Sequence, residues 1–136
     1  MKRYGFLDKE QIYRVLNKVR DAFLAAKGGE EVEEVMSALL TFDERMKVGR
    51  RVQIAEMLKS GCSHEEIVQE LKVGKSTVAL VNRLIEEHPK GYELVLRRGK
   101  KVEEEYMNKR YKEVGGSEMI FKRREYSGIR RKDIKR

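Results

Sequence analysis

The chain has 136 residues, of which 40% are hydrophobic and 40% charged, with one proline and no tryptophan. The 31 Lys and Arg residues exceed the 23 Asp and Glu, so the formal net charge is +8, which favours a polyanionic partner, nucleic acid ahead of a membrane. A single cysteine, Cys62, excludes an internal disulfide or a cysteine zinc site. Without an apolar run of about 18 residues or an apolar leader, we expect a cytoplasmic protein that does not span a membrane.

Three helices are predicted in the first 60 residues. Over 8–26, apolar residues recur at steps of three or four after Asp8, a good N-cap, and a glycine pair follows. A second amphipathic pattern covers about 30–40. The third helix is expected after Thr41, which forms a capping box with Glu44, and ends near Ser60-Gly61.

Two more helices follow. Ser63 and Glu66 form a second capping box at the start of a helix that runs to about residue 71. After Val73-Gly74, a helix over 75–88 ends before Pro89. Five helices with short connections and no strand pattern predict an all-α domain, in which residues 63–88 form a helix-turn-helix.

The C-terminal segment differs in character. We expect Gly91, Gly99 and Gly115-Gly116 to break it, so that only residues 100–114 are helical. Residues 122–136 hold eight basic and two acidic residues. The chain is thus divided into residues 1–88, for dimerisation and the helix-turn-helix, and a basic C-terminal extension, 89–136. Tyr126 in the tail could stack on a single-stranded base, and a disordered, solvated tail is the alternative.

The helix-turn-helix pattern predicts which side chains face outward. Gly74 is expected to supply the positive φ of a sharp turn, while Ile67, Leu71, Val78 and Val81 hold the two helices together. The outer face of the second helix then carries the candidate DNA-binding residues, which are Lys75, Ser76, Thr77, Ala79, Asn82 and Arg83.

Other interpretations of this region are weaker. The string GKST is half of a nucleotide-binding loop, but the first glycine of that motif would fall at Gln69. An ordinary helical hairpin in a globular core is an alternative on the pattern alone. Against DNA binding, Lys72, Lys75 and Arg83 are balanced by Glu65, Glu66 and Glu70, so the unit is neutral. Cations for phosphate contact must then come from Arg50, Arg51, other lysines or the tail. We find no metal site and no enzyme chemistry in the sequence.

The run LLTFDERMKVGRRVQIAEMLKSGCSHEEIVQELKVGKSTVALVNRLI resembles the helix-turn-helix core of the Trp repressor (TrpR/YerC-like) family. The matching positions are Leu40, Thr41, Asp43, Glu44, Arg45, Gly49, Arg51, Val52, Ile54, Leu58, Gly61, Ser63, Leu71, Gly74 and Thr77. This resemblance implies an intertwined homodimer that presents two reading helices to a pseudo-palindromic operator about one helical turn apart.

The sequence departs from that family at the ligand site. The resemblance implies that two arginines clamp the indole of tryptophan, one of which matches Arg51. In the family the other arginine is followed by a glycine, and these two positions are Leu80 and Val81 here. Leu80 cannot stack on the indole as a cation, and Val81 is larger than the glycine that it replaces. We therefore predict that tryptophan does not bind and that no cofactor is required.

The sequence as a whole predicts a sequence-specific regulator, a probable repressor, that binds double-stranded DNA as a homodimer. Arg50, Arg51 and the tail would lie near phosphates. The alternative is an RNA-binding or RNA-associated protein that uses its tail for affinity and its helix-turn-helix for dimerisation. A protein-interaction adaptor is a third, weaker interpretation.

Overall fold

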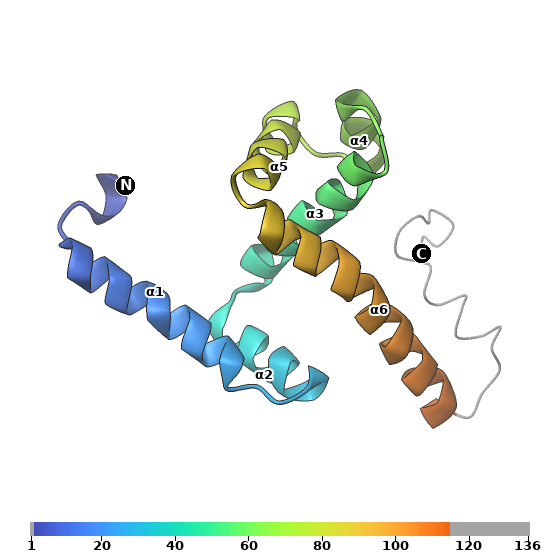
Figure 1. Cartoon of the computed structure of the whole chain (residues 1–136), viewed down its shortest axis with the longest axis horizontal. Coiled ribbons are helices and arrows are strands. Elements are labelled where there is room, and N and C mark those ends of the chain that lie inside the picture. Colours follow the sequence, from blue (N-terminus) through green and yellow to red (C-terminus); the bar gives the residue numbers. More distant parts are fainter. Residues whose placement is uncertain (1, 115–136) are drawn as a thin grey trace. The chain divides into compact units, whose positions relative to one another are not determined.

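The computed structural model describes residues 2–114, with side chains over 3–108, and every regular element in that range is a helix. The elements are a short 3-10 helix, η1 (Lys2–Tyr4), followed by α1 (Lys9–Leu24), α2 (Gly29–Leu39), α3 (Phe42–Lys59), α4 (His64–Leu71), α5 (Lys75–Glu87) and α6 (Pro89–Val114) (Figure 1). The predicted all-α class is confirmed, and the first five predicted helices agree with α1–α5 to within two residues at each end. The basic tail and Tyr126 lie outside the described residues.

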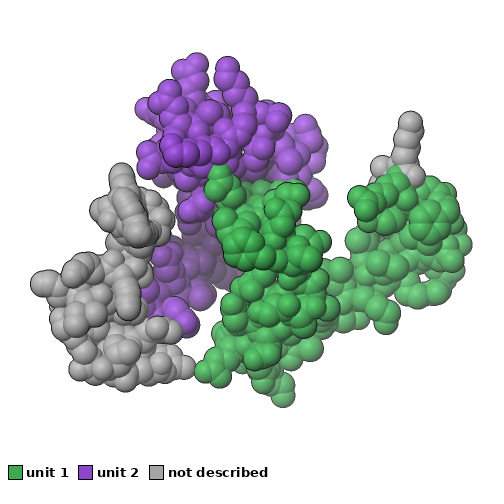
Figure 2. All heavy atoms as spheres, turned by 180° about the vertical axis from the view of Figure 1, so that it is seen from behind, with its two compact units in different colours: residues 1–51 green, residues 52–136 purple. Residues whose placement is uncertain are grey.

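The chain divides between Arg51 and Val52 into two compact units (Figure 2). The first contains η1, α1, α2 and the beginning of α3. The second contains the end of α3, α4, α5 and α6. The expected functional division at residue 88 stays a prediction. No described helix is both long and apolar enough to cross a membrane.

Side-chain caps define the starts of α1 and α3 in the first unit, whereas α2 begins after Gly28 without one. The Asp8 carboxylate accepts a hydrogen bond from the Gln11 N–H at 2.8 Å, and the Gln11 side chain accepts one from the Asp8 N–H at 2.9 Å. Thr41 and Glu44 form the same reciprocal pair at 2.7 and 3.1 Å. Hydrogen bonding to the backbone N–H of Thr41, and then to its side chain, lowers the pKa of the Glu44 carboxyl. The two capped starts follow directly from the local sequence.

The apolar faces of the first unit are largely uncovered. No side chain described in residues 3–51 is fully buried, although α1 and α2 are amphipathic. Leu24 and Phe42 are 74% and 79% exposed. Arg45 on α3 does bind α2, with its guanidinium 2.6 Å from a Glu33 carboxylate oxygen and 3.1 Å from the Ser37 hydroxyl. Polar contacts thus join helices whose apolar side chains still lack a complementary surface.

The second unit has a compact aliphatic core drawn from three helices. Ile54 and Ala55 of α3, Ile67 of α4, and Val78 and Val81 of α5 are completely buried. Full burial of a valine or isoleucine side chain stabilises a fold by roughly 1.5–3 kcal/mol, so these few residues fix the angle between α4 and α5. As predicted, Ile67, Val78 and Val81 lie inside, with Leu71 partly buried beside them.

The sharp turn between α4 and α5 is made differently from the sequence prediction. Lys72, the C-cap of α4, has the left-handed conformation with φ 54° and ψ 51°. Gly74 instead has φ −79° and ψ 157°, an extended conformation open to any residue. The prediction of a positive φ at Gly74 was therefore wrong. The chain reverses direction at the residue that directly follows α4, which is where helices commonly end in the left-handed region.

The prediction that Gly91 and Gly99 break the C-terminal segment was also wrong, because α6 is a continuous helix of 26 residues. Pro89 suits the first helical position, since it has no N–H to satisfy there, and the His88 carbonyl accepts from the Tyr92 N–H at 3.2 Å. Each internal glycine costs about 1 kcal/mol relative to alanine. Tyr92 and Leu96 pack against the core and offset that cost.

Candidate nucleic-acid interface

The two helices of the helix-turn-helix differ at their N-termini: α4 has a side-chain cap and α5 has none. At the start of α4, the Ser63 hydroxyl accepts from the Glu66 N–H at 3.1 Å and the Glu66 carboxylate accepts from the Ser63 N–H at 2.9 Å. With Glu65 beside them, acidic side chains complement the positive N-terminus of this helix. The start of α4 is therefore satisfied within the chain itself.

The start of α5 has no such complement. Its N-cap, Gly74, provides no side-chain hydrogen bond, and the first turn of α5 contains no acidic residue. The Gly74 carbonyl accepts from the N–H groups of Thr77 and Val78 at 3.1 and 3.3 Å, so the helix is properly initiated. Lys75 and Ser76 occupy this first turn and are exposed. A helix N-terminus with a free cation and a hydroxyl has the chemistry to bind a phosphate group.

Four of the six candidate residues on α5 lie on the side of the helix away from its buried valines, and the other two lie nearer the core. Lys75, Ser76, Ala79 and Arg83 are exposed, and Thr77 and Asn82 are half-buried. Arg83 lies 3.8 Å from a Glu87 carboxylate oxygen on the same helix, and both side chains are more than half exposed. Such an exposed pair contributes at most about 1 kcal/mol, so it leaves Arg83 available to another anion.

Arg50 and Arg51 belong to the first unit, on the part of α3 that precedes the division. Arg50 is half-buried and Arg51 exposed. They are neighbours on α3, but they belong to a different unit from the candidate residues of α5, and the positions of the two units relative to each other are not defined. Their role beside phosphates stays a prediction.

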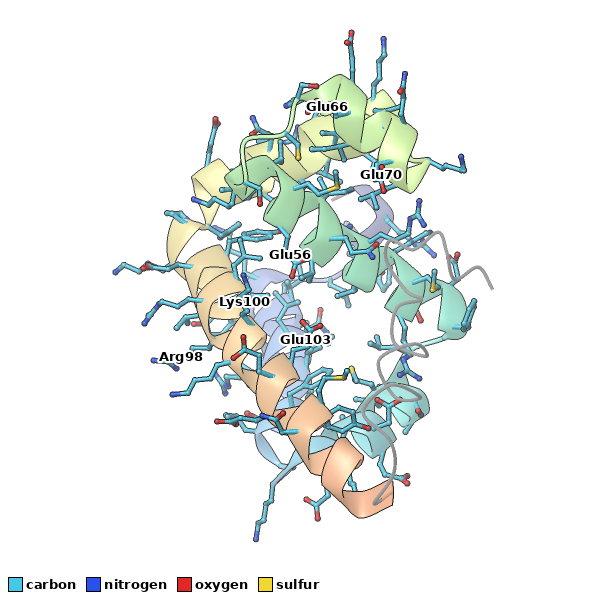
Figure 3. The ribbon with its side chains drawn as sticks, turned by 90° about the vertical axis from the view of Figure 1, so that its right-hand side faces the viewer. Glu56, Glu66, Glu70, Arg98, Lys100 and Glu103 are labelled. Carbon is cyan, nitrogen blue, oxygen red and sulfur yellow. The ribbon has the colours of Figure 1, made fainter. Side chains whose placement is uncertain are left out.

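Acidic residues lie on α4, the neighbour of α5. Glu66 and Glu70 are both on this helix (Figure 3) and are exposed. Glu66 is occupied by the capping box, which fixes its carboxylate on its own backbone. The exposed acidic side chains of this pair of helices are thus on α4, and the first turn of α5 contains none.

Sequence reasoning missed the electrostatic interaction between Glu56 of α3 and the middle of α6. Burial raises the pKa of the Glu56 carboxyl above its ordinary value near 4.5, the charge of Glu103 adds to the rise, and Lys100 opposes it. Figure 3 shows Glu56 facing Lys100 and Glu103. No sequence signal could have indicated this interaction, because Glu56 and the two residues of α6 are far apart in the sequence. Among the described residues, no group of three His, Cys, Asp or Glu is arranged to hold a metal ion.

A capped α4, a three-residue turn and an α5 with an open N-terminus, held by one aliphatic core, define a helix-turn-helix protein. Comparison with known proteins identifies the family, because residues 14–100 match the model of the Trp repressor protein. The chain belongs to the Trp repressor family, and its class is that of a DNA-binding transcriptional regulator.

Two curated proteins illustrate this relationship. The uncharacterized protein YerC of Bacillus subtilis (strain 168) is 28% identical over 94 residues, which are 69% of this chain and 90% of YerC. The Trp operon repressor homolog of Pasteurella multocida (strain Pm70) is 36% identical over 81 residues, 59% of this chain and 76% of that protein. No solved structure matches the chain significantly. The resemblance to the Trp repressor (TrpR/YerC-like) family is thereby confirmed.

Proposed function

We propose that the protein is a sequence-specific transcriptional repressor that binds double-stranded DNA in the cytoplasm through α5. The observation that carries the proposal is the open N-terminus of α5, whose exposed Lys75 and Ser76 lie on a helix fixed by buried Val78 and Val81. A rigid helix with this outer face has the dimensions to enter a major groove. Asn82 is half-buried on the same helix and has amide chemistry suited to an adenine edge.

The same proposal includes a homodimer. Its support is the first unit, in which amphipathic α1 and α2 leave residues such as Leu24 and Phe42 exposed. Soluble chains rarely leave large apolar patches uncovered, and a second copy supplies a complementary surface by symmetry. Two copies of α5 would then meet half-sites about 34 Å apart on one side of the duplex. Sedimentation equilibrium at several protein concentrations measures the association directly.

The experiment that tests DNA recognition is selection of bound sequences from random duplex DNA by the full chain. A defined two-fold site supports the proposal. The variants Ser76→Ala and Asn82→Ala should then change base preference at particular positions, each at a cost of about 1–3 kcal/mol. Lys75→Gln should weaken all duplexes alike, because it removes a phosphate contact. If the chain is a folded dimer but enriches no DNA sequence in this selection, the proposal is wrong and the adaptor interpretation is favoured.

A further inference from the structure

The first half of α6 carries a concentration of positive charge. From Lys90 to Lys101 the chain has five basic residues and one acidic residue, Glu93. Four of the basic residues form what we call the basic face of α6, namely Lys90, Arg97, Arg98 and Lys101. All four are exposed, and within residues 3–108, whose side chains the structure describes, no ion pair involves any of them. Their charges are available to an external anion.

The continuity of α6 places these four cations together. They follow one another at steps of seven, one and three residues, a spacing that keeps side chains on one side of an α-helix. If Gly99 ended the helix, as the sequence predicts, Lys101 would not share a face with Arg97. The basic face is therefore a consequence of the continuous helix and not of the local sequence alone.

The basic face lies on the side of α6 away from the core. Tyr92 and Leu96 pack against the buried residues, and Arg98, two residues after Leu96, lies about half a turn further round the helix. Figure 3 shows that Arg98 points away from Glu56, whereas Lys100 faces it. One side of α6 thus holds the helix on the core, and the opposite side is positive.

α6 is also attached firmly to the candidate DNA-binding helix. Only His88 separates the end of α5 from the start of α6, and Tyr92 and Leu96 pack against the core that contains Val78 and Val81 of α5. The 13 residues of α5 extend roughly 20 Å, so the basic face is far from the first turn of α5. Cations at that distance from the reading turn suit contacts to phosphates and not to bases.

The charge of the basic face complements a weakness of the helix-turn-helix. Between residues 63 and 85 basic and acidic side chains balance, whereas affinity for DNA depends on cations that neutralise phosphates. Five basic residues and one acidic residue give the stretch from Lys90 to Lys101 a charge of +4. This stretch is roughly 16 Å long, and the same length of duplex carries about four phosphates on each strand.

We propose that the basic face of α6 binds backbone phosphates of duplex DNA beside the groove that α5 enters. This inference rests on the proposed function, because α5 must bring the duplex to the protein. In this arrangement α6 supplies affinity that does not depend on sequence, and α5 supplies the preference for particular bases.

A salt titration that compares two neighbouring lysines of α6 tests the proposal. Lys101→Gln removes a cation from the basic face, and Lys100→Gln is the matched control, because it removes the same charge from the side that faces Glu56. Dissociation constants of the full chain for duplex DNA are measured by fluorescence anisotropy at several salt concentrations, and circular dichroism confirms that each variant is folded.

The slope of the logarithm of affinity against the logarithm of salt concentration is the decisive quantity. It should become shallower by about 1 for Lys101→Gln and by about 2 when Arg97→Gln is added, and it should not change for Lys100→Gln. Lys101→Arg keeps the charge and should keep the slope. The proposal is wrong if the double variant has the same slope as Lys100→Gln.

Two comparisons separate this proposal from sequence recognition by α5. The titration is repeated on a duplex of random sequence, so α6 is tested even if the selection identifies no preferred site. The double variant should also select the same bases as the unaltered chain, and a changed preference contradicts a role limited to phosphates. If the double variant has a shallower slope with duplex RNA but not with duplex DNA, the basic face binds RNA and the proposal fails.

Discussion

Lys72 holds the turn between α4 and α5 in a backbone conformation that crowds its own Cβ, with φ 54°. A non-glycine residue there costs roughly 1–2 kcal/mol. We expect Lys72→Gly to raise the free energy of unfolding of the full chain by about 1 kcal/mol, measured by urea denaturation. Lys72→Ala is the matched control, because it removes the same side chain but keeps the Cβ. A glycine variant no more stable than the alanine variant contradicts the prediction.

Glu56 gives the second unit a pH dependence of known sign. Burial and the charge of Glu103 raise the pKa of this carboxyl in the folded state, so the folded chain binds the proton more tightly than the unfolded chain. Stability from this residue is full at acidic pH and falls as pH rises from about 4.5 through the raised folded-state pKa. Glu56→Gln should remove that decline and increase stability at pH 7. Glu70→Gln, an exposed glutamate of α4, is the control, and a steeper fall in the Glu56 variant would refute the sign.

At the scale of the element, two residues of α5 underlie the prediction that tryptophan is not an effector of this protein. Val81 is completely buried in the core and Leu80 is half-buried. If an indole bound where the family resemblance implies, it would find neither a cation at position 80 nor free space at position 81. Titration calorimetry should detect no saturable tryptophan binding in the micromolar range. Leu80→Arg should not create it, since Val81 still fills the position, and saturable heat from the unaltered chain would overturn this expectation.

The helices differ in how far local sequence determines them. Ser63 with Glu66 and Thr41 with Glu44 were predicted as capping boxes and are formed, because every group involved lies within three residues of its partner. Gly61, predicted to end α3, has φ 93°, which favours glycine. The continuity of α6, in contrast, could not be predicted from neighbouring residues. Its glycines argue locally against helix, while the compensating burial of Tyr92 and Leu96 involves distant parts of the chain.

The candidate site was predictable to a similar extent. Helical periodicity placed Val78 and Val81 inside and Lys75, Ser76 and Arg83 outside, as the structure has them. The left-handed residue could not be identified, because Lys72 has no special preference for that conformation and adopts it only where two crossed helices require it. The relation of Arg50 and Arg51 to α5 depends on assembly and is not contained in one chain's periodicity.

At the scale of the whole molecule, the basic tail distinguishes the DNA and RNA interpretations. The tail is best removed after Val114, since α6 supplies Tyr92 and Leu96 to the helix-turn-helix core and a shorter chain would lose them. A chain that ends at Val114 should keep its preference for the selected duplex but bind all DNA more weakly. Its salt dependence should be shallower by about 0.9 for each lost phosphate contact. Complete loss of binding, with RNA as the lost ligand, would favour the alternative.

The missing side-chain cap of α5 links the stability of this helix to its ligand. Because Gly74 provides no side-chain cap, we expect the N–H groups of the first turn of α5 to exchange with solvent more readily than those of α4, which Ser63 covers. On the proposed function, a DNA phosphate becomes the cap that the sequence omits. DNA binding should then slow hydrogen-deuterium exchange at the N–H groups of Lys75 and Ser76 much more than at those of Glu65 and Glu66. The bound DNA would in that case stabilise the first turn of α5 as a side-chain cap does in α4.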